Sequence, residues 1–364
     1  MASSSDDFTI STSSGPSSEE TTIPRSLPPK AGRSHAHNEF LRREDIRGED
    51  VEILEQEERL NGVQISSYRR IRRKLREPLA EFLGCVVFIV FGDGSVAQKV
   101  LSNEAAGNEM SVNFSFGVGV MIGFLVSVAG GAAGHLNPAI TLANCIFRKF
   151  PWKKLPMYFL AQFLGCGFGA AIVFGTYRTS ITHFDGGTRA VTGATSTAGI
   201  YNTYPQEFLD EAAQIMSEFS ASIILAICVN AIAVQSSPRR DPHLPVEWNL
   251  VRGMSLFLAI YVIGASLGWQ TGYAINPARD FGPRMVAYMA GYGREVFWAY
   301  NNYSWIPVVM PFLGAIAGQG IFDFMVIEND EESFVTSPSI AITKLKKTLR
   351  GEPLVQSDIE KTQK

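Results

Sequence analysis

The chain has 364 residues, of which 46% are hydrophobic and 18% are charged, and its formal net charge is -3. This near-neutral balance gives no basis for expecting a nucleic-acid partner. The averages resemble those of a soluble protein, but residues 1–77 are polar, residues 78–327 are mostly apolar, and the remainder is polar again. This segregation argues against an ordinary soluble fold and places the structured part in the middle of the chain.

The first 60 or so residues are rich in Ser, Thr, Glu and Pro. They show no apolar periodicity long enough to bury a helix face, so we expect a disordered tail. The tail also lacks the short apolar run and small-residue cleavage site of a secretory signal peptide. Its many hydroxyl groups raise the hypothesis that it is phosphorylated or gates the protein, with a neutral tether as the alternative.

Six apolar stretches in the middle segment are long enough to be membrane-spanning helices. A helix needs about 20 apolar residues to cross a hydrocarbon core about 30 Å thick, because unpaired backbone groups are costly there. Pro, Gly or charged residues bound each stretch. The predicted spans are residues 78–100, 112–132, 154–177, 210–234, 249–269 and 303–327.

Basic residues favour one side of these predicted spans. They cluster before the first and third spans and between the fourth and fifth, which predicts that both termini are cytoplasmic. The loops on the other side are poorer in Lys and Arg, with Lys99, Arg178, Arg189 and Arg294 as the main exceptions. The residues that set this orientation are Arg69, Arg70, Arg72, Arg73, Lys74, Arg76, Arg148, Lys149, Lys153, Lys154, Arg239 and Arg240.

Two further apolar segments are too short to span, and each begins with the same triplet. Asn137-Pro138-Ala139 and Asn276-Pro277-Ala278 lie 139 residues apart (276 − 137). Each follows a lone carboxylate in an apolar span, Glu81 or Glu218, by 56 and 58 residues respectively (137 − 81 and 276 − 218). The matched spacing predicts a duplicated three-span unit, and six spans place its two copies in inverted orientation.

Each triplet is typical of a helix start, because Asn is a good N-cap and Pro loses no hydrogen bond in the first turn. Two half-helices entering from opposite faces would bring their amino ends together near mid-membrane, where partial positive charge repels cations. The Asn137 and Asn276 amides could then donate hydrogen bonds to a passing water or alcohol. The alternative is that each triplet is only a turn or a cap.

On these motifs the sequence resembles the major intrinsic protein family, the aquaporins and glycerol facilitators. The resemblance covers residues 75–328 and is carried by His135-Leu136-Asn137-Pro138-Ala139-Ile140-Thr141 and by Gly272-Tyr273-Ala274-Ile275-Asn276-Pro277-Ala278-Arg279-Asp280. It implies an all-α membrane protein with six transmembrane helices and two re-entrant half-helices in an inverted repeat. It also implies a passive channel that excludes protons and ions.

The resemblance implies a selectivity filter formed by Arg279, Gly264, Tyr273 and an aromatic residue on the second span. Arg279 is a permanent cation and hydrogen-bond donor, and its alternative role is that of a structural ion-pair partner or a snorkelling residue. The aromatic position is Phe116 by its local Phe-Gly-Val-Gly string, whereas counting back from Asn137 without a gap gives Gly117. Core packing is the alternative role for Phe116.

Two positions favour glycerol, and a third leaves the substrate open. Water-selective members of the family usually carry His where Gly264 stands, so Gly leaves room for a polyol. Asp280 after Arg279 matches the glycerol-conducting branch, although charge balance or loop structure is its alternative role. Tyr273 departs from the Phe found in bacterial glycerol facilitators, which leaves the substrate range open.

The two carboxylates and His135 are expected to support the half-helices. Glu81 and Glu218 should accept hydrogen bonds from the loops leading into them, with a proton relay as the alternative. His135 should pack beside the first triplet, where it could line the cytoplasmic half of the pore, and it lacks a metal-ligand set. We expect no metal or cofactor, and we expect the four cysteines to be packing residues: Cys85, Cys145, Cys166 and Cys228.

Small residues four apart predict close helix contacts at two places, Gly165 with Gly169 and Gly314 with Gly318. The expected domains are a cytoplasmic tail at 1–68, a channel domain at 69–328 and a cytoplasmic tail at 329–364. Within the channel domain, the two repeats are expected at 75–178 and 207–328.

The expected function is passive, bidirectional transport of glycerol, other small uncharged solutes and water across a lipid bilayer, with protons and ions excluded. The alternatives are a water-selective channel, a hydrogen peroxide channel, and a secondary transporter with alternating access. An enzyme is not expected, because the sequence contains no nucleophile elbow, metal signature or phosphate-binding loop. Family resemblance further implies a homotetramer, and we expect it in the plasma membrane.

Overall fold

The computed structural model describes residues 66–235 and 248–327. All of them belong to one compact unit, Val63–Lys364. Several expectations concern residues outside the described ranges: the disorder, phosphorylation and gating of the N-terminal tail, the tail after residue 328, and the orientation signal from Arg239 and Arg240.

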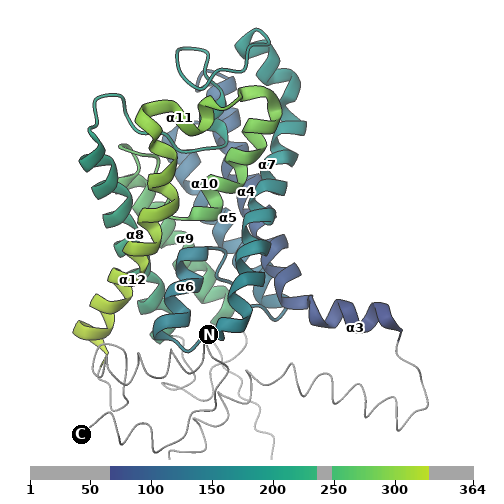
Figure 1. Ribbon diagram of the computed structural model, residues 1–364, viewed down its shortest axis with the longest axis vertical. Helices are drawn as coiled ribbons and strands as arrows, with labels where there is room; N and C mark the ends of the chain where they lie inside the picture. The colour runs from purple at the N-terminus through teal and green to yellow at the C-terminus, as the bar shows by residue number, and fades with distance from the viewer. Residues whose placement is uncertain (1–65, 236–247, 328–364) are drawn as a thin grey trace, which may run out of the picture. The chain divides into compact units, whose positions relative to one another are not determined.

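The described residues are all-helical, without strands, as predicted. Six of their helices are long and apolar enough to cross a membrane, which confirms the six predicted spans (Figure 1). These helices are α4 (Arg76–Leu101), α5 (Glu109–Ala129), α7 (Leu155–Asp185), α8 (Glu211–Gln235), α9 (Trp248–Leu267) and α12 (Ile306–Val326).

The ends of two spans differ from the prediction for local reasons. Helix α5 begins at Glu109 because Asn108 and Ser111 form a capping box, each side chain bonding the other's backbone N–H. Helix α7 continues to Asp185, beyond the predicted end at 177, and stops where Gly186 adopts a left-handed conformation with φ 64°. The apolar pattern marks where a helix crosses lipid and carries no signal for helical turns beyond it.

The two short helices are α6 (Pro138–Phe147) and α10 (Pro277–Ala287). At a rise of about 1.5 Å per residue, each is roughly 15 Å long, half of a hydrocarbon core. Each has Pro in its first turn and an extended Asn as N-cap, Asn137 for α6 and Asn276 for α10. Figure 1 shows both short helices among the long ones, with α10 above α6 in that view.

Shorter elements connect these helices. Helix α3 precedes the first span, η1 leads into α7, and η2 lies between α7 and α8. After α10 the chain continues through η3, α11 and η4 into α12. Their bounds are α3 (Ser67–Lys74), η1 (Trp152–Lys154), η2 (Ala198–Ile200), η3 (Tyr288–Tyr292), α11 (Glu295–Asn302) and η4 (Tyr303–Trp305).

The two repeats pack in the same way. In the first repeat α4 packs against α7, and in the second α8 packs against α12. A Cβ atom on Gly165 of α7 would lie 2.5 Å from the carbonyl oxygen of Phe82 on α4. A Cβ atom on Gly169 would lie 2.9 Å from the Cβ atom of Ile89, also on α4. The predicted close contacts therefore exist, and Gly314 and Gly318 make the equivalent contacts between α12 and α8. Helix α5 packs against α9 and joins the repeats.

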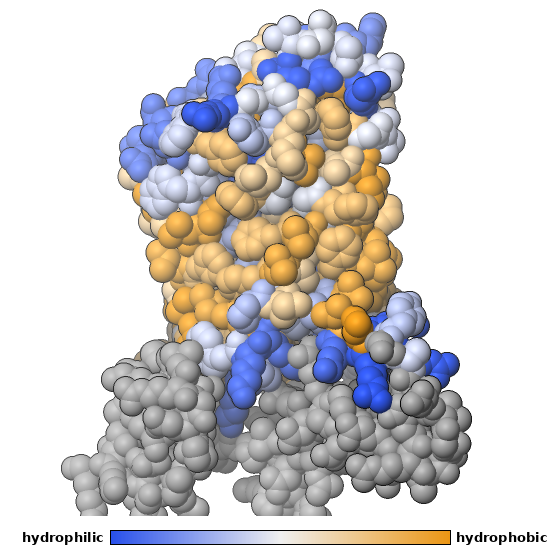
Figure 2. Space-filling model, turned by 45° about the vertical axis from the view of Figure 1, so that its right-hand side comes forward, coloured by the Kyte–Doolittle hydropathy of each residue, from blue (hydrophilic) through white to orange (hydrophobic). Residues whose placement is uncertain are grey.

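The surface of the bundle matches a lipid environment. Figure 2 shows an apolar band around the middle of the visible face, with hydrophilic residues toward both ends of the described part. Large apolar side chains such as Leu83, Leu164 and Leu258 are exposed, whereas Glu81 and Glu218 are fully buried. The helices therefore present apolar side chains outward and enclose polar groups, which is the arrangement that a bilayer favours. The cysteines are free thiols; three are buried and Cys228 is partly buried.

Candidate functional site

The amino ends of the two half-helices meet. The Asn137 side-chain nitrogen donates a hydrogen bond of 2.9 Å to the carbonyl oxygen of Ile275, and the Asn276 nitrogen donates one of 2.8 Å to the carbonyl oxygen of Leu136. Each Asn also caps its own helix, because its side-chain oxygen accepts from the backbone N–H of Ala139 or Ala278. One amide hydrogen of each Asn remains after these contacts.

The two buried glutamates hold the loops that enter the half-helices. Glu81 accepts hydrogen bonds from the backbone N–H groups of His135 and Leu136, at 2.8 and 2.9 Å. Glu218 accepts the matching pair from Ala274 and Ile275, both at 3.0 Å. These bonds satisfy backbone donors that would otherwise be costly in an apolar interior.

Leu136 and Ile275 share an unusual backbone conformation. Their φ angles are 51° and 44°, in the left-handed region that β-branched and bulky residues rarely adopt. Each residue donates its N–H to a buried glutamate and offers its carbonyl oxygen to the opposite Asn. Two hydrogen bonds per residue stabilise this strained conformation. The conformation directs each carbonyl oxygen toward the Asn of the other repeat.

His135 packs beside the first triplet. Its two ring nitrogens lie 3.2 Å from the Thr141 hydroxyl oxygen and 3.1 Å from the Asn144 side-chain nitrogen. Its ring also contacts the rings of Phe150 and Tyr158. Across the described ranges, no group of three or more His, Cys, Asp or Glu residues is arranged to hold a metal ion.

Arg279 lies in the first turn of α10 and is held by three kinds of contact. Its Nη1 atom donates to the carbonyl oxygen of Tyr201 at 3.0 Å and lies 3.5 Å from Oδ1 of Asp93 on α4. Its guanidinium carbon lies 4.6 Å from the centroid of the Phe116 ring, a cation–π distance. Arg279 is thus both an ion-pair partner and a neighbour of the expected filter aromatic. The ion-pair role that the sequence left as an alternative is therefore present, and the filter role stays a prediction.

The structure places Phe116, and not Gly117, beside Arg279. The Phe116 ring lies 6.2 Å from the Tyr273 ring, edge to face. A Cβ atom on Gly117 would instead lie 2.8 Å from the side chain of Phe257, so Gly117 faces α9. Of the two residues that the sequence left open, Phe116 is the neighbour of Arg279, and its place in a filter stays a prediction.

The space beside Gly264, left by its missing side chain, is occupied by Tyr273 and Asn113. A Cβ atom on Gly264 would lie 2.7 Å from Cζ of Tyr273 and 2.6 Å from Oδ1 of Asn113. The Tyr273 hydroxyl donates to that same Oδ1 at 2.8 Å. The glycine therefore admits the tyrosine ring, which differs from the expectation that it leaves open space for a permeant. The phenol is already bonded on this side.

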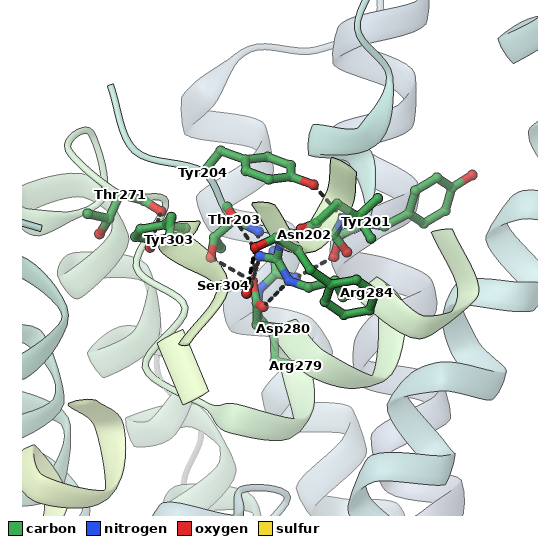
Figure 3. A network of polar contacts seen from close by, with 12 residues as sticks. Tyr201, Asn202, Thr203, Tyr204, Thr271, Arg279, Asp280, Arg284, Tyr303 and Ser304 are labelled. Atoms are coloured by element: carbon green, nitrogen blue, oxygen red, sulfur yellow. Dashed lines mark hydrogen bonds and ion pairs between the residues drawn. The ribbon is translucent and has the colours of Figure 1, made fainter. Parts of the chain in front are cut away.

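Asp280 and Arg284 form a buried ion pair one helical turn apart on α10 (Figure 3). Asp280 accepts from Nε and Nη2 of Arg284 at 2.7 and 2.8 Å, and also from the backbone and hydroxyl of Thr203. Arg284 in turn donates to the carbonyl oxygens of Thr203 and Val296. The pair fastens the chain around residue 203 and helix α11 to the half-helix, so Asp280 serves charge balance and loop structure here.

Tyr204 covers the same ion pair. The guanidinium carbon of Arg284 lies 4.9 Å from the centroid of its ring. Burial raises the pKa of the Tyr204 phenol to about 12, so the ring is neutral at ordinary pH. A neutral ring face accommodates the guanidinium, and the stack completes the cover over Arg284.

Sequence reasoning missed several of these residues. Asp93 is a lone carboxylate in an apolar span, so the argument that singled out Glu81 and Glu218 applies to it equally. Asn113 and Thr203 carry no such signal, because a polar residue near the end of a span or in a loop is ordinary. Their partners lie 160 and 77 residues away in the chain, Tyr273 and Asp280.

Comparisons with known proteins agree on one family. The family pattern described as "Major intrinsic protein" matches residues 68–322. The X-ray structure of the aquaglyceroporin from Plasmodium falciparum superposes with a TM-score of 0.60 at 27% sequence identity, covering 69% of this chain and 96% of that one.

Curated relatives from two fungi are also similar. Aquaglyceroporin-9 of Botryotinia fuckeliana is 42% identical over 294 residues, which are 80% of this chain and 62% of that relative, so the match spans less than two thirds of its length. Probable aquaglyceroporin-2 of Gibberella zeae is 45% identical over 262 residues, 71% of this chain and 75% of that relative. The family expected from the two triplets is confirmed. The chain is a member of the major intrinsic protein family.

Proposed function

We propose that this protein is a membrane channel for the passive, bidirectional passage of glycerol, other small uncharged solutes and water. The observation that carries the proposal is the reciprocal contact between the half-helices, in which Asn137 and Asn276 each bond the loop of the opposite repeat. It joins two helix amino ends and two partly free amide donors at one point. A neutral hydroxylated molecule suits that point, whereas a cation does not.

Exclusion of protons and cations follows from the same arrangement. Pore diameter, lining donors and the positive ends of half-helices are the recognised selectivity elements of aquaporin-type pores. In this chain the amide hydrogen that each Asn retains can orient the oxygen of a passing water molecule, so that the molecule cannot relay a proton along the file. The two half-helix dipoles add partial positive charge on both sides of that oxygen.

The residues around Arg279 form the proposed selectivity filter. Both polar contacts of the Arg279 side chain use Nη1, so within the described residues its Nε and Nη2 atoms have no protein partner. These donors suit the hydroxyl groups of a polyol. The rings of Phe116 and Tyr273, 6.2 Å apart, offer an apolar wall for its carbon side. A filter with donors on one side and rings on the other supports glycerol as a substrate.

The names of the relatives support the same substrates. The Botryotinia and Gibberella proteins and the Plasmodium structure are all called aquaglyceroporins.

The Tyr273 hydroxyl is bonded to Asn113, so the proposed filter aromatic presents its ring to a permeant more than its hydroxyl group. This geometry favours glycerol over the first alternative, a strictly water-selective channel. The second alternative is a channel for hydrogen peroxide, which is also a small neutral solute.

The deciding experiment measures glycerol uptake and osmotic water permeability in the same proteoliposomes. We expect both to rise above protein-free vesicles, with low proton leak. Absence of glycerol uptake with normal water permeability would overturn the glycerol assignment and leave a water channel. Counter-flow separates a channel from a secondary transporter, because a channel shows no stimulation by unlabelled substrate on the opposite side.

Several further properties are proposed from the family and the charge pattern. We place the protein in the plasma membrane with both termini cytoplasmic, because the basic residues cluster before α4 and α7. We propose a homotetramer with one pore per subunit and no enzymatic activity. Protease protection of tags at either terminus tests the orientation, and the mass of the purified channel in detergent tests the assembly.

A further inference from the structure

Two neighbouring residues of α4, Gly92 and Asp93, contact the proposed filter. They lie in the first span, far along the chain from the second triplet. Asp93 is fully buried, and its Oδ1 atom lies 3.5 Å from Nη1 of Arg279. A Cβ atom on Gly92 would lie 2.2 Å from Cε1 of Phe116. One turn of α4 therefore touches both the cation and the aromatic ring.

The contact at Asp93 fixes one arm of the guanidinium. Nη1 of Arg279 also donates to the Tyr201 carbonyl oxygen at 3.0 Å, so both of its hydrogens have acceptors. The guanidinium carbon lies over the Phe116 ring, 4.6 Å from its centroid. With one arm bonded and the guanidinium placed over the ring, the remaining nitrogens, Nε and Nη2, have a defined direction.

The contact at Gly92 fixes the ring. Phe116 is buried and also meets the ring of Phe88 edge to face, with centroids 6.0 Å apart. Any side chain on Gly92 would overlap the Phe116 ring, which would have to turn or shift. The ring would then change its distance to both Arg279 and Tyr273.

Asp93 is bonded far less completely than the other buried carboxylate near this place. Asp280 accepts four hydrogen bonds, from Thr203 and Arg284. Asp93 has a single long contact, and its Oδ2 atom is buried without a partner in the described structure. A buried carboxylate held this sparsely is a poor device for stability, because its desolvation is only partly offset. Its placement against Arg279 accounts for it better.

We propose that Gly92 and Asp93 are positioning residues of the filter. Asp93 holds the guanidinium, and Gly92 admits the Phe116 ring beneath it, so that two donors of Arg279 face the hydroxyl groups of a permeating polyol. This proposal deepens the proposed function and rests on it. It predicts that glycerol, which needs two oriented donors, depends on Asp93 more than water does.

The main test is a double-mutant cycle in proteoliposomes, with glycerol and water permeability measured per inserted channel. Asp93→Asn keeps the shape and removes the charge, and we expect the glycerol-to-water ratio to fall about fivefold. In an Arg279→Lys background, which removes the planar fork, Asp93→Asn should lower the ratio little further. Asp93→Glu, which retains the charge, should keep part of the wild-type ratio.

The matched control is Asp323→Asn. Asp323 on α12 is also a buried carboxylate paired with an arginine, Arg148 at the end of α6, but it makes no contact with Arg279. We expect its glycerol-to-water ratio to equal that of the wild type. Gly92→Ala gives an independent measurement through Phe116, should Asp93→Asn insert poorly, and should lower the same ratio.

The outcomes are distinct. A wild-type ratio in both Asp93→Asn and Gly92→Ala would overturn the proposal, as would an equal proportional fall in the wild-type and Arg279→Lys backgrounds. A wild-type channel that conducts no glycerol would instead overturn the proposed function itself. A reduced ratio in Asp93→Asn that disappears in the Arg279→Lys background supports the positioning role, because a general packing defect would act in both backgrounds.

Discussion

The two half-helix entries share one scaffold and differ in their side chains. In both, a buried glutamate accepts two backbone N–H groups, and the second of these belongs to a residue with positive φ. The Asn after that residue caps its own helix and donates a hydrogen bond to the loop of the other repeat. At the next positions the repeats diverge. Ile140, Thr141 and Cys145 of α6 correspond, at the 139-residue offset of the triplets, to Arg279, Asp280 and Arg284 of α10.

This difference separates the framework that the repeats share from the charged groups of the second repeat. The shared hydrogen bonds hold the amino ends of the two half-helices together. They occur twice because each repeat contributes one half-helix. The charges at these three positions belong to the second repeat, where Arg279 lies beside Phe116 and the Asp280–Arg284 pair anchors Thr203 and α11. The first entry carries neutral bonds at the matching place, for example Gln162 donating to Thr141 at 3.0 Å. Substitutions at paired positions should therefore have unequal effects only where the repeats differ.

The largest unequal effect is expected at Asp280 and its counterpart Thr141. Asp280→Asn leaves Arg284 buried with an incomplete partner, which should cost about 3–5 kcal/mol of stability. Thr141→Val removes only neutral hydrogen bonds and should cost about 1 kcal/mol. Thermal unfolding of the detergent-solubilised channel measures both. Similar losses for the two variants would contradict the view that the second repeat carries the charged anchor.

An equal effect is expected at the two glutamates. Glu81→Gln and Glu218→Gln each replace one acceptor oxygen by a donor and leave a backbone N–H unpaired, so each should cost about 1–3 kcal/mol. The same unfolding measurement applies, with Gly175→Ala as the control, because a Cβ atom on Gly175 has no neighbour within 4 Å. A loss in only one of the two variants would show that the repeats do not share this scaffold.

The proposed filter should respond to added volume at Gly264. Gly264→His must displace Tyr273 and Asn113, and we expect glycerol flux to fall about tenfold, and more than water flux, since strain of this kind costs about 1–3 kcal/mol. Gly175→Ala on α7 is the control, because a Cβ atom there has no neighbour within 4 Å. Equal loss of both fluxes in a normally inserted channel would remove Gly264 from the filter.

The smallest effect is expected at the Tyr273 hydroxyl. Tyr273→Phe removes its bond to Asn113 and should lower stability by about 1 kcal/mol, with the filter ring kept in place. Glycerol and water fluxes should both remain within about twofold of the wild type, because the hydroxyl is directed at protein. A selective rise in water flux would indicate that the phenol itself restricts the passage.

The sequence by itself determined the architecture. Apolar length predicts a membrane span because unpaired backbone groups are costly in lipid, and the repeated Asn-Pro-Ala triplet predicts a helix start wherever it stands. These are local signals, and the six spans, the two half-helices and the family were all predicted from them. The local string around Phe116 also singled out the residue that lies beside Arg279, while its role in a filter stays a prediction.

Only the tertiary structure decided which side chains meet. Asp93 pairs with Arg279 from 186 residues away, and Asn113 accepts from Tyr273 across 160 residues. It also showed that Tyr273 fills the space beside Gly264. Such contacts depend on how α4, α5 and α9 pack around the half-helices, and packing joins distant residues without leaving a periodic or spaced pattern in the chain. The physical reason is that the length of an apolar stretch is a local property of the sequence, whereas the pairing of polar groups depends on how the resulting helices pack together.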